Sequence, residues 1–291
     1  MDPRFTVRDD YLLPLEDGQA VSRGWTQATA FRPVGVTWHW TATWDLGKCR
    51  EVIGGPEPER KGEASAHYAI GRSFDEGVDR YVLLENRSWH AGKEQLLRWD
   101  GQALESPAFK GARTTVGIET VNIGYAREEA PAGPDWLPGA TPDGQQQLLI
   151  QPWTEPQIEM MIAIGKEVVA RWPHIRPGDH QGHQDLCPTY KQDVLCFPFA
   201  RVLRGIYDDP GLPDRWTPYW TVAGRQKALR QLGFRLDDAE LAESRWGTTS
   251  DQALRGCQQL AGLVVDGLWT CFVSRAIHGE LMHRGIDPAA L

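Results

Sequence analysis

The chain has 291 residues, of which 41% are hydrophobic and 24% are charged. These fractions are close to those of folded soluble proteins and exclude a largely disordered or fibrous molecule. The length is enough for one large domain and one small domain. The net charge of -8 argues against nucleic acid as the main partner, because a surface that binds phosphates needs clustered Lys and Arg.

The cysteines and the first residues bear on the compartment of the protein. Five cysteines are an odd number and include no CxxC pair, which fits neither a disulfide framework nor a four-thiolate zinc site. We therefore expect free and mostly buried thiols. The opening stretch, MDPRFTVRDDYLLPLEDG, is acidic where a signal peptide carries basic and then apolar residues. Because no apolar run approaches ~18 residues either, we expect neither a conventional signal peptide nor a membrane span.

Segments rich in β-branched and aromatic residues predict four strands in the first half of the chain. Residues 34–44, VGVTWHWTATW, follow a proline and predict a buried strand with His39 near its C-terminal end. Residues 65–72 and 79–85 flank the turn sequence SFDEG and predict a hairpin. Residues 114–124, TTVGIETVNIG, predict a further strand.

A helix and a linker follow. Residues 154–173 carry apolar side chains at helical spacing and end at a proline, which predicts one long helix. Strands and helices thus mix as in an α/β (α+β) protein with a mixed central β-sheet flanked by helices. The proline-rich stretch after this part predicts a linker, so we place a catalytic domain at 1–207, the linker at 208–219 and a second domain at 220–291.

The second domain contains three short amphipathic segments, at residues 223–234, 248–263 and 274–285. Glycine-bearing breaks separate them. The spacing predicts a small domain of three helices.

Two histidines and an aspartate could form a metal site if strand ends and loops bring them together. His39, His183 and Asp193 supply two imidazoles and a carboxylate, which leave one position open on a tetrahedral zinc, as in hydrolytic sites. Lys191 would reach the same pocket if its segment is extended, and its cation could stabilise the oxyanion formed by attack on an amide carbonyl. From the residues alone, each histidine could equally be packed or solvated.

Five sequence blocks occur in order within residues 30–205. HWTA begins at His39, SAHYAI at Ser65, WHAG at Trp89, VGIE at Val116 and GHQDLCPTYKQD at Gly182. In this order they resemble the zinc-dependent N-acetylmuramoyl-L-alanine amidases of the type 2 family, which also includes peptidoglycan recognition proteins and phage amidases.

The resemblance implies roles for individual residues. The zinc ligands of the family match His39, His183 and Asp193. The lysine that polarises the scissile carbonyl matches Lys191, and the acidic general base matches Glu119. A carboxylate at a strand end close to the metal could contact the attacking water, as a general base must.

The chain departs from the family pattern after the last ligand. Members often continue with KxDPG, whereas this chain reads KQDVLC. Cys187 and Cys196 lie close enough in sequence to compete with Asp193 as the third ligand, because a thiolate binds zinc well. The position of Asp193 relative to Lys191 favours the aspartate.

Trp89, His90 and Tyr68 are the predicted substrate contacts. The WHAG block resembles a segment that borders the substrate cleft, although packing is an equal alternative for Trp89 and His90. For His67 we expect a structural role or a contact that supports a ligand. His180, three residues before a matched ligand, is expected to be exposed.

The C-terminal segment resembles the peptidoglycan-binding module found beside many cell-wall hydrolases. The matching features are QLGF, WGTTSDQAL and GLVVDGLW. Thr248 or Thr249 can cap the helix that begins in the second feature, and Gly267 permits a tight turn in the third. A plain helical dimerisation tail is the alternative.

Together the resemblances imply an enzyme that uses Zn²⁺ to hydrolyse the amide bond between N-acetylmuramic acid and L-alanine in peptidoglycan or muropeptides. Its partner would then be the peptidoglycan or muropeptide substrate. A non-catalytic peptidoglycan recognition protein is the alternative, as is the same chemistry in an antibacterial toxin or a phage lysin. The complete ligand set favours the enzyme, which we expect to be made in the cytoplasm and to act on the cell wall in the periplasm.

Overall fold

The computed structural model of the protein describes most of the chain. The described residues are 4–13, 21–22, 24–28, 30–54, 63–93, 95–97, 103–105, 111–140, 146–187, 190–212, 222–269 and 271–286. The predicted linker lies outside the described residues from position 213 onwards.

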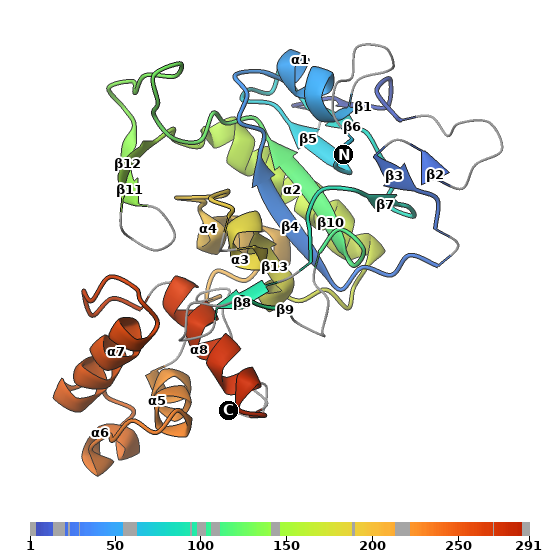
Figure 1. The fold of residues 1–291 in the computed structure, drawn as a ribbon. Helices are drawn as coiled ribbons and strands as arrows, with labels where there is room; N and C mark the ends of the chain where they lie inside the picture. Colours follow the sequence, from blue (N-terminus) through green and yellow to red (C-terminus); the bar gives the residue numbers. More distant parts are fainter. Residues whose placement is uncertain are drawn as a thin grey trace.

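Within the described residues, a six-stranded mixed sheet forms the centre of the molecule (Figure 1). Its strands run in the order β1 (Val7–Arg8), β6 (Val78–Arg80), β5 (Tyr68–Ile70), β10 (Thr115–Thr120), β4 (Gly35–Trp40) and β13 (His180–Gly182). The four strands from β5 to β13 are parallel, whereas β6 is antiparallel to β5. The carboxyl ends of β4 and β10 therefore meet at one edge of the sheet.

The strands of this sheet confirm the predicted fold class. β4, β10 and β5 lie within predicted segments, and β6 begins at Val78, one residue before the segment predicted for it. Gly77 adopts a φ of +66° in the hairpin turn, a conformation that costs glycine little. The strands are shorter than predicted, since β4 ends at Trp40 and β6 at Arg80. β13 was not predicted, because its sequence HQG lacks the β-branched residues that signal a strand.

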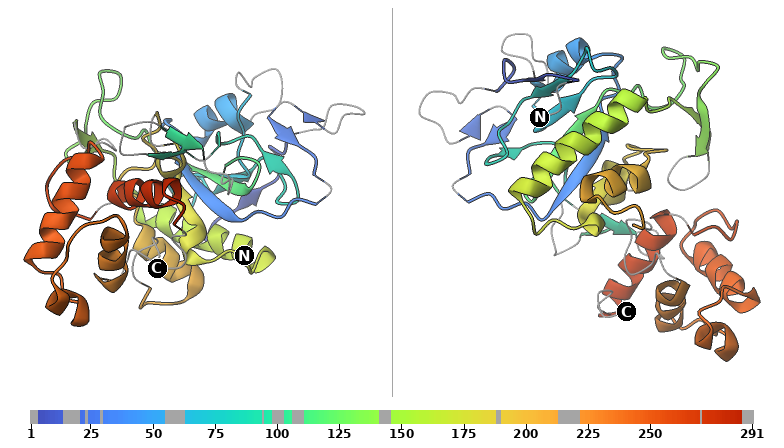
Figure 2. Two further views of the ribbon diagram at one scale, coloured as in Figure 1. Left: turned by 60° about the horizontal axis from the view of Figure 1, so that its bottom comes forward. Right: turned by 180° about the vertical axis from the view of Figure 1, so that it is seen from behind.

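Helix α2 (Glu155–Arg171) covers one face of the sheet (Figure 2). It begins with a capping box in which Thr154 and Gln157 each bond the other's backbone amide through the side chain. Its buried side chains, among them Met161 and Ile164, share the main core cluster with Trp38. Helix α4 (Phe199–Tyr207) packs against α2. The predicted long helix is thus confirmed.

The other face of the sheet carries a second core cluster. Helix α1 (Leu46–Cys49) and the π-helix η1 (Arg50–Gly54) pack there with Ala69 and Val121. The remaining short elements are β2 (Val21–Ser22), β3 (Trp25–Thr26), β7 (Arg87–Ser88), β8 (Gln95–Leu97), β9 (Ala103–Glu105), β11 (Leu137–Ala140), β12 (Gln147–Ile150), the 3-10 helix η2 (Pro177–Asp179) and α3 (His183–Leu186).

The C-terminal part is helical in the residues that the structure describes. Its helices are α5 (Val222–Gln231), α6 (Asp238–Ala242), α7 (Thr248–Leu260) and α8 (Cys271–His283). The short α6 adds a fourth helix to the three that were predicted. They enclose a core cluster of their own, which includes Leu229, Leu254 and Ile277. Helix α8 also lies against α3 and β8 of the sheet-bearing part (Figures 1 and 2).

The start of α7 is capped differently from the prediction. The N-cap residue is Gly247, and neither Thr248 nor Thr249 caps the helix with its side chain. Instead the buried carboxylate of Glu240 accepts hydrogen bonds from the backbone amides of Thr249 and Ser250, both at 3.0 Å, and from the Ser250 hydroxyl at 2.6 Å. An anion at a helix N-terminus is favoured by the unpaired amides and by the helix dipole.

The cysteines agree in part with expectation. Cys49, Cys187 and Cys257 are free and buried, whereas Cys196 is free and exposed. Among the described residues, no helix has both the length and the apolar character to cross a bilayer.

Candidate active site

Three predicted ligands converge at the carboxyl edge of the sheet. Nδ1 of His39 and Nδ1 of His183 each lie 3.1 Å from the same oxygen, Oδ2 of Asp193. One potential ligand atom from each residue lies within 4.8 Å of the others, and all three side chains are buried. The arrangement is a compact set of two imidazoles and one carboxylate.

Strand pairing and a loop bring these residues together. β13 is parallel to β4, and Gly182, its last residue, lies opposite Trp38. The residues that follow these two in sequence, His183 at the start of α3 and His39 in β4, are therefore neighbours. The chain then runs through α3 and returns, and the backbone amide of Gln184 donates a hydrogen bond to the carbonyl of Asp193. This contact places the Asp193 carboxylate against both rings.

Burial and the carboxylate set the charges of the cluster. Burial, followed by the proximity of His183, lowers the pKa of His39 to about 4, so this ring is neutral near pH 7. Burial also opposes protonation of His183, but the adjacent Asp193 carboxylate outweighs it and raises the pKa of His183 to about 9. Burial would raise the pKa of Asp193, yet the two histidines hold it below its usual value. The cluster thus favours an ionised Asp193 with a positive charge beside it.

The donor set fits a zinc ion. The Asp193 carboxylate favours a positive charge beside it, which a proton on His183 supplies in part. A divalent cation would supply more of that charge. Two imidazole nitrogens and a carboxylate oxygen are standard ligands in catalytic zinc sites, which leave a fourth position open. Among the described residues, the group of possible ligands includes neither Cys187 nor Cys196, and Cys187 instead donates its thiol to the carbonyl of Lys93 at 3.4 Å.

Glu119 lies next to this cluster on β10. Its Oε1 atom is 4.0 Å from Nδ1 of His39, and its side chain is 12% exposed. Oε2 is buried and has no hydrogen-bond partner among the described residues. Burial, reinforced by the nearby Asp193 carboxylate, raises the pKa of Glu119 well above its ordinary value. A carboxyl group of raised pKa can exchange protons close to neutral pH.

Lys191 lies in the loop that leads to Asp193. Its side chain is half-buried, its backbone amide donates to the carbonyl of Cys187, and its ammonium lies 5.7 Å from the ring centre of Tyr190. Its positive charge lowers the pKa of both His39 and Glu119, although burial is the larger influence on each. The cation is therefore within electrostatic reach of the cluster.

Tyr68 does not belong to the site, which contradicts its predicted role as a substrate contact. It is fully buried, and its hydroxyl donates to Glu167 of α2 at 2.9 Å. Tyr68 pairs with Ile118 on β10, one position before Glu119. Because side chains alternate across a strand, Tyr68 and Glu119 point to opposite faces of the sheet.

His90 and His67 are both buried. His90 is only 7% exposed and bonds through both ring nitrogens, which favours packing over substrate contact, the two alternatives that the sequence left open. His67 is buried and bonds Ser88, Gly117 and Asn86, in agreement with a structural role.

His180 was expected to be exposed, and this expectation is wrong. Its ring is buried between the indole of Trp38, which donates to Nδ1 at 3.3 Å, and the hydroxyl of Tyr207, 2.9 Å from Nε2. His180 lies on β13, and this strand directs its ring into the core beside Trp38. Because the strand was not predicted, neither was the burial of His180.

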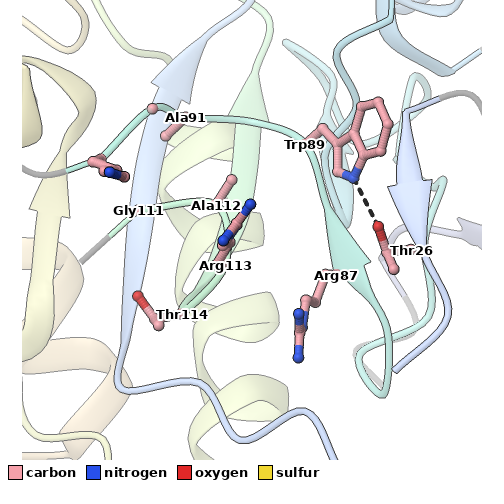
Figure 3. Close-up of a pocket in the computed structure, with 10 residues that line it drawn as sticks. Thr26, Arg87, Trp89, Ala91, Gly111, Ala112, Arg113 and Thr114 are labelled. Atoms are coloured by element: carbon pink, nitrogen blue, oxygen red, sulfur yellow. Dashed lines mark hydrogen bonds between the residues drawn. The ribbon is translucent and has the colours of Figure 1, made fainter. Parts of the chain in front are cut away.

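A pocket of about 990 Å³ lies beside the segment that carries His90. Figure 3 shows residues that line it. It is lined by Arg87, Trp89, residues 91–93, residues 111–114 and Thr26. The hydroxyl of Thr26 accepts a hydrogen bond from the indole of Trp89 at 3.0 Å. Arg87, Lys93 and Arg113 make the lining cationic. Of the lining residues, none is a proposed ligand, but Trp89 and Ala91 flank His90, whose ring contacts His39.

Sequence reasoning missed the cationic side chains of this pocket. They come from two separate segments, and neither segment carries a run of basic residues. Only their juxtaposition across the sheet edge reveals a common surface.

Two of the solved structures that are similar to this chain are those of amidases. AmiD from E. coli, solved with the substrate anhydro-N-acetylmuramic acid-L-Ala-D-gamma-Glu-L-Lys, is 18% identical, with a TM-score of 0.47 over 90% of this chain and 94% of that chain. AmpDH3 from Pseudomonas aeruginosa, solved with anhydromuramic pentapeptide, is 17% identical, with a TM-score of 0.48 over 94% and 99% of the two chains. A search of curated proteins found no match.

The family assignment comes from the sequence. The protein-family model for N-acetylmuramoyl-L-alanine amidase matches residues 30–194, which is more than half of the chain and includes His39, Glu119, His183 and Asp193. The match confirms the resemblance drawn from the five sequence blocks. The chain belongs to the N-acetylmuramoyl-L-alanine amidase family and is a peptidoglycan amidase.

Proposed function

We propose that the chain hydrolyses the bond between N-acetylmuramic acid and L-alanine with a zinc ion held by His39, His183 and Asp193. The observation that carries the proposal is the approach of both Nδ1 atoms to one buried oxygen of Asp193, each at 3.1 Å. Zinc bound there supplies Lewis acidity, which activates water near neutral pH.

Glu119 serves as the general base and then as the general acid. Its Oε2 atom, which has no hydrogen-bond partner among the residues that the structure describes, and its raised pKa suit a group that takes a proton from the attacking water. The same carboxyl then delivers the proton to the nitrogen of L-alanine, which leaves as an amine. The pair of transfers returns Glu119 to its starting state.

Lys191 stabilises the negative charge that develops on the scissile carbonyl oxygen. Its side chain is half-buried, and its positive charge lies within electrostatic reach of Glu119 and His39. A fixed cation in a partly desolvated site interacts with such a charge more strongly than water does.

The pocket beside the segment that carries His90 receives the stem peptide. A stem peptide carries carboxylates, which the cationic lining would attract, and Nε of Arg87 is buried with no hydrogen-bond partner among the described residues. Trp89 is 38% exposed and presents an aromatic face at the rim, so it is the predicted substrate contact that keeps this role.

The helical region from Val222 onwards serves as a separate binding domain for the peptidoglycan polymer. Its core cluster shares no described residue with the two clusters of the sheet-bearing part, as expected of a unit with its own fold. Binding to the polymer would raise the local concentration of the enzyme on its substrate, and the site of action is then the cell wall in the periplasm.

Digestion of purified sacculi and soluble muropeptides, followed by mass spectrometry, tests the proposal. We expect free stem peptides that begin with L-alanine, loss of the product after chelation, and its return when zinc is added. Cleavage at a different bond would contradict the substrate assignment. Undiminished cleavage by a preparation shown to be metal-free would contradict the role of zinc.

A further inference from the structure

A chain of buried hydrogen bonds leads from the sheet backbone to the metal-ligand cluster. Nε2 of His90 lies 3.0 Å from the carbonyl oxygen of Thr115, and Nδ1 of His90 lies 3.0 Å from Nε2 of His39. On the other side of its ring, Nδ1 of His39 faces Asp193. His39 thus uses one nitrogen toward the cluster and the other toward His90.

The acceptor at the end of this chain determines where the protons lie. A carbonyl oxygen can only accept, so Nε2 of His90 carries a hydrogen and donates it to Thr115. In the neutral ring, Nδ1 of His90 is then an acceptor, and Nε2 of His39 donates to it. This leaves the lone pair of His39 Nδ1 directed at the position between His183 and Asp193.

The backbone is adapted to hold the His90 ring in place. Gly117 lies in the interior of β10, where glycine is unfavourable, and an added Cβ there would lie 2.3 Å from Cγ of His90. The ring therefore lies directly over the strand, in space that only glycine leaves open. Its neighbours in sequence, Trp89 and Ala91, line the pocket instead.

We propose that His90 is a positioning residue that fixes the tautomer and the orientation of His39 and so prepares Nδ1 of His39 as a zinc ligand. Ring nitrogens of ligating histidines that do not bind the metal commonly donate to an acceptor that fixes the ring, and loss of that acceptor typically weakens metal binding. Here the acceptor is another histidine, itself fixed by the backbone of β10. The inference rests on the zinc site of the proposed function.

Two substitutions separate this role from packing. In His90→Asn, the amide oxygen replaces Nδ1 near the backbone and can still accept from Nε2 of His39. In His90→Leu, the side chain has a similar bulk but no acceptor. We expect zinc affinity, measured by competition with a chromogenic chelator, to fall about 10–100-fold in the leucine variant and to remain close to wild type in the asparagine variant.

His180→Leu provides a matched control. His180 is also a buried histidine of this sheet that bonds through both nitrogens, but the residues that it bonds there, Trp38 and Tyr207, are not proposed ligands. We expect this variant to lose thermal stability and to retain zinc affinity. Circular dichroism and thermal unfolding establish that each variant is folded before its affinity is compared.

Nitrogen NMR of the zinc-loaded wild-type protein gives a second measurement that does not depend on any variant. We expect His39 to carry its hydrogen on Nε2 and His90 to carry its hydrogen on Nε2. A hydrogen on Nδ1 of His90 would overturn the inference, as would equal zinc affinity in the wild type and both His90 variants. An equal loss in the asparagine and leucine variants would assign His90 to packing. Failure of the wild type itself to bind zinc would instead refute the proposed function.

Discussion

Glu119 lies opposite His39 in adjacent parallel strands, with its Oε1 atom 4.0 Å from Nδ1 of His39. Residues paired in this way share one face of the sheet, so the same alternation that turns Tyr68 away from the site turns Glu119 into it. The strand register therefore couples the proposed base to the first proposed ligand.

Glu119→Gln should retain zinc and fold but lose about 10²–10³ in turnover, because it removes proton transfer without removing a ligand. Since the pKa of Glu119 is raised, this side chain loses its proton at a higher pH than an ordinary glutamate. The wild-type pH–rate profile should then show an acid limb that rises with pH, and the residual rate of the variant should lack it. Near-normal turnover in the variant would remove Glu119 from the mechanism.

His183→Ala should lower the zinc content of the purified protein well below one ion per chain, because it removes one of three ligands. His174→Ala is the control, since His174 is exposed and bonds the carbonyl of Pro33. Elemental analysis after dialysis compares the two. Stoichiometric zinc in His183→Ala would contradict the ligand assignment.

Lys191→Met should keep its zinc and lose about 10²–10³ in turnover, as expected when a group that stabilises an oxyanion is removed. Lys166→Met is the control, because the ammonium of Lys166 pairs with Asp208 on the surface at 2.6 Å. Steady-state kinetics on a soluble muropeptide measures both. A rate in Lys191→Met equal to that of the control would exclude the proposed role.

Glu240→Gln should destabilise the helical region at neutral pH, because Glu240 caps α7. The Ser250 hydroxyl and the α7 amides hold the pKa of Glu240 at about 2, below its ordinary value of 4.5. A lowered pKa in the folded state stabilises the fold fully above the ordinary pKa, and this contribution is lost as the pH falls from 4.5 toward 2. The difference in urea midpoint between wild type and variant should thus shrink between pH 7 and pH 3.

Glu243→Gln is the control, because Glu243 is an exposed glutamate paired with Arg245, and it should change the urea midpoint little at either pH. A difference for Glu240→Gln that does not depend on pH would contradict the cap.

A chain that ends at Leu212 should fold, bind zinc and cleave soluble muropeptides at a rate similar to the full chain. We place the cut after Leu212 and not at the predicted end at residue 207, because Leu212 belongs to the main core cluster and its carbonyl accepts from Arg204. Sacculi should be cleaved more slowly, since the helical region no longer tethers the enzyme to the polymer. Loss of the contacts of α8 with α3 and β8 should lower the melting temperature. Equal rates on sacculi would contradict a role in targeting, and an unfolded product would show that the helical region completes the fold.

Local sequence patterns determined much of this protein. The β-branched runs of β4 and β10 and the apolar periodicity of α2, which ends before a proline, predicted the central elements, because these signals act within a few neighbouring residues. The order of five sequence blocks carried the family, and with it the candidate ligands His39, His183 and Asp193.

Only the tertiary structure decided which side chains meet. The alternation of a strand is visible in sequence, but which of Tyr68 and Ala69 faces the site depends on the register with β10 and on the helix that covers the sheet. The same holds for the contact of His90 with His39 and for the cap that Glu240 provides, since each joins residues from separate elements. Such contacts arise from packing between segments that are distant in sequence, so local propensity does not predict them.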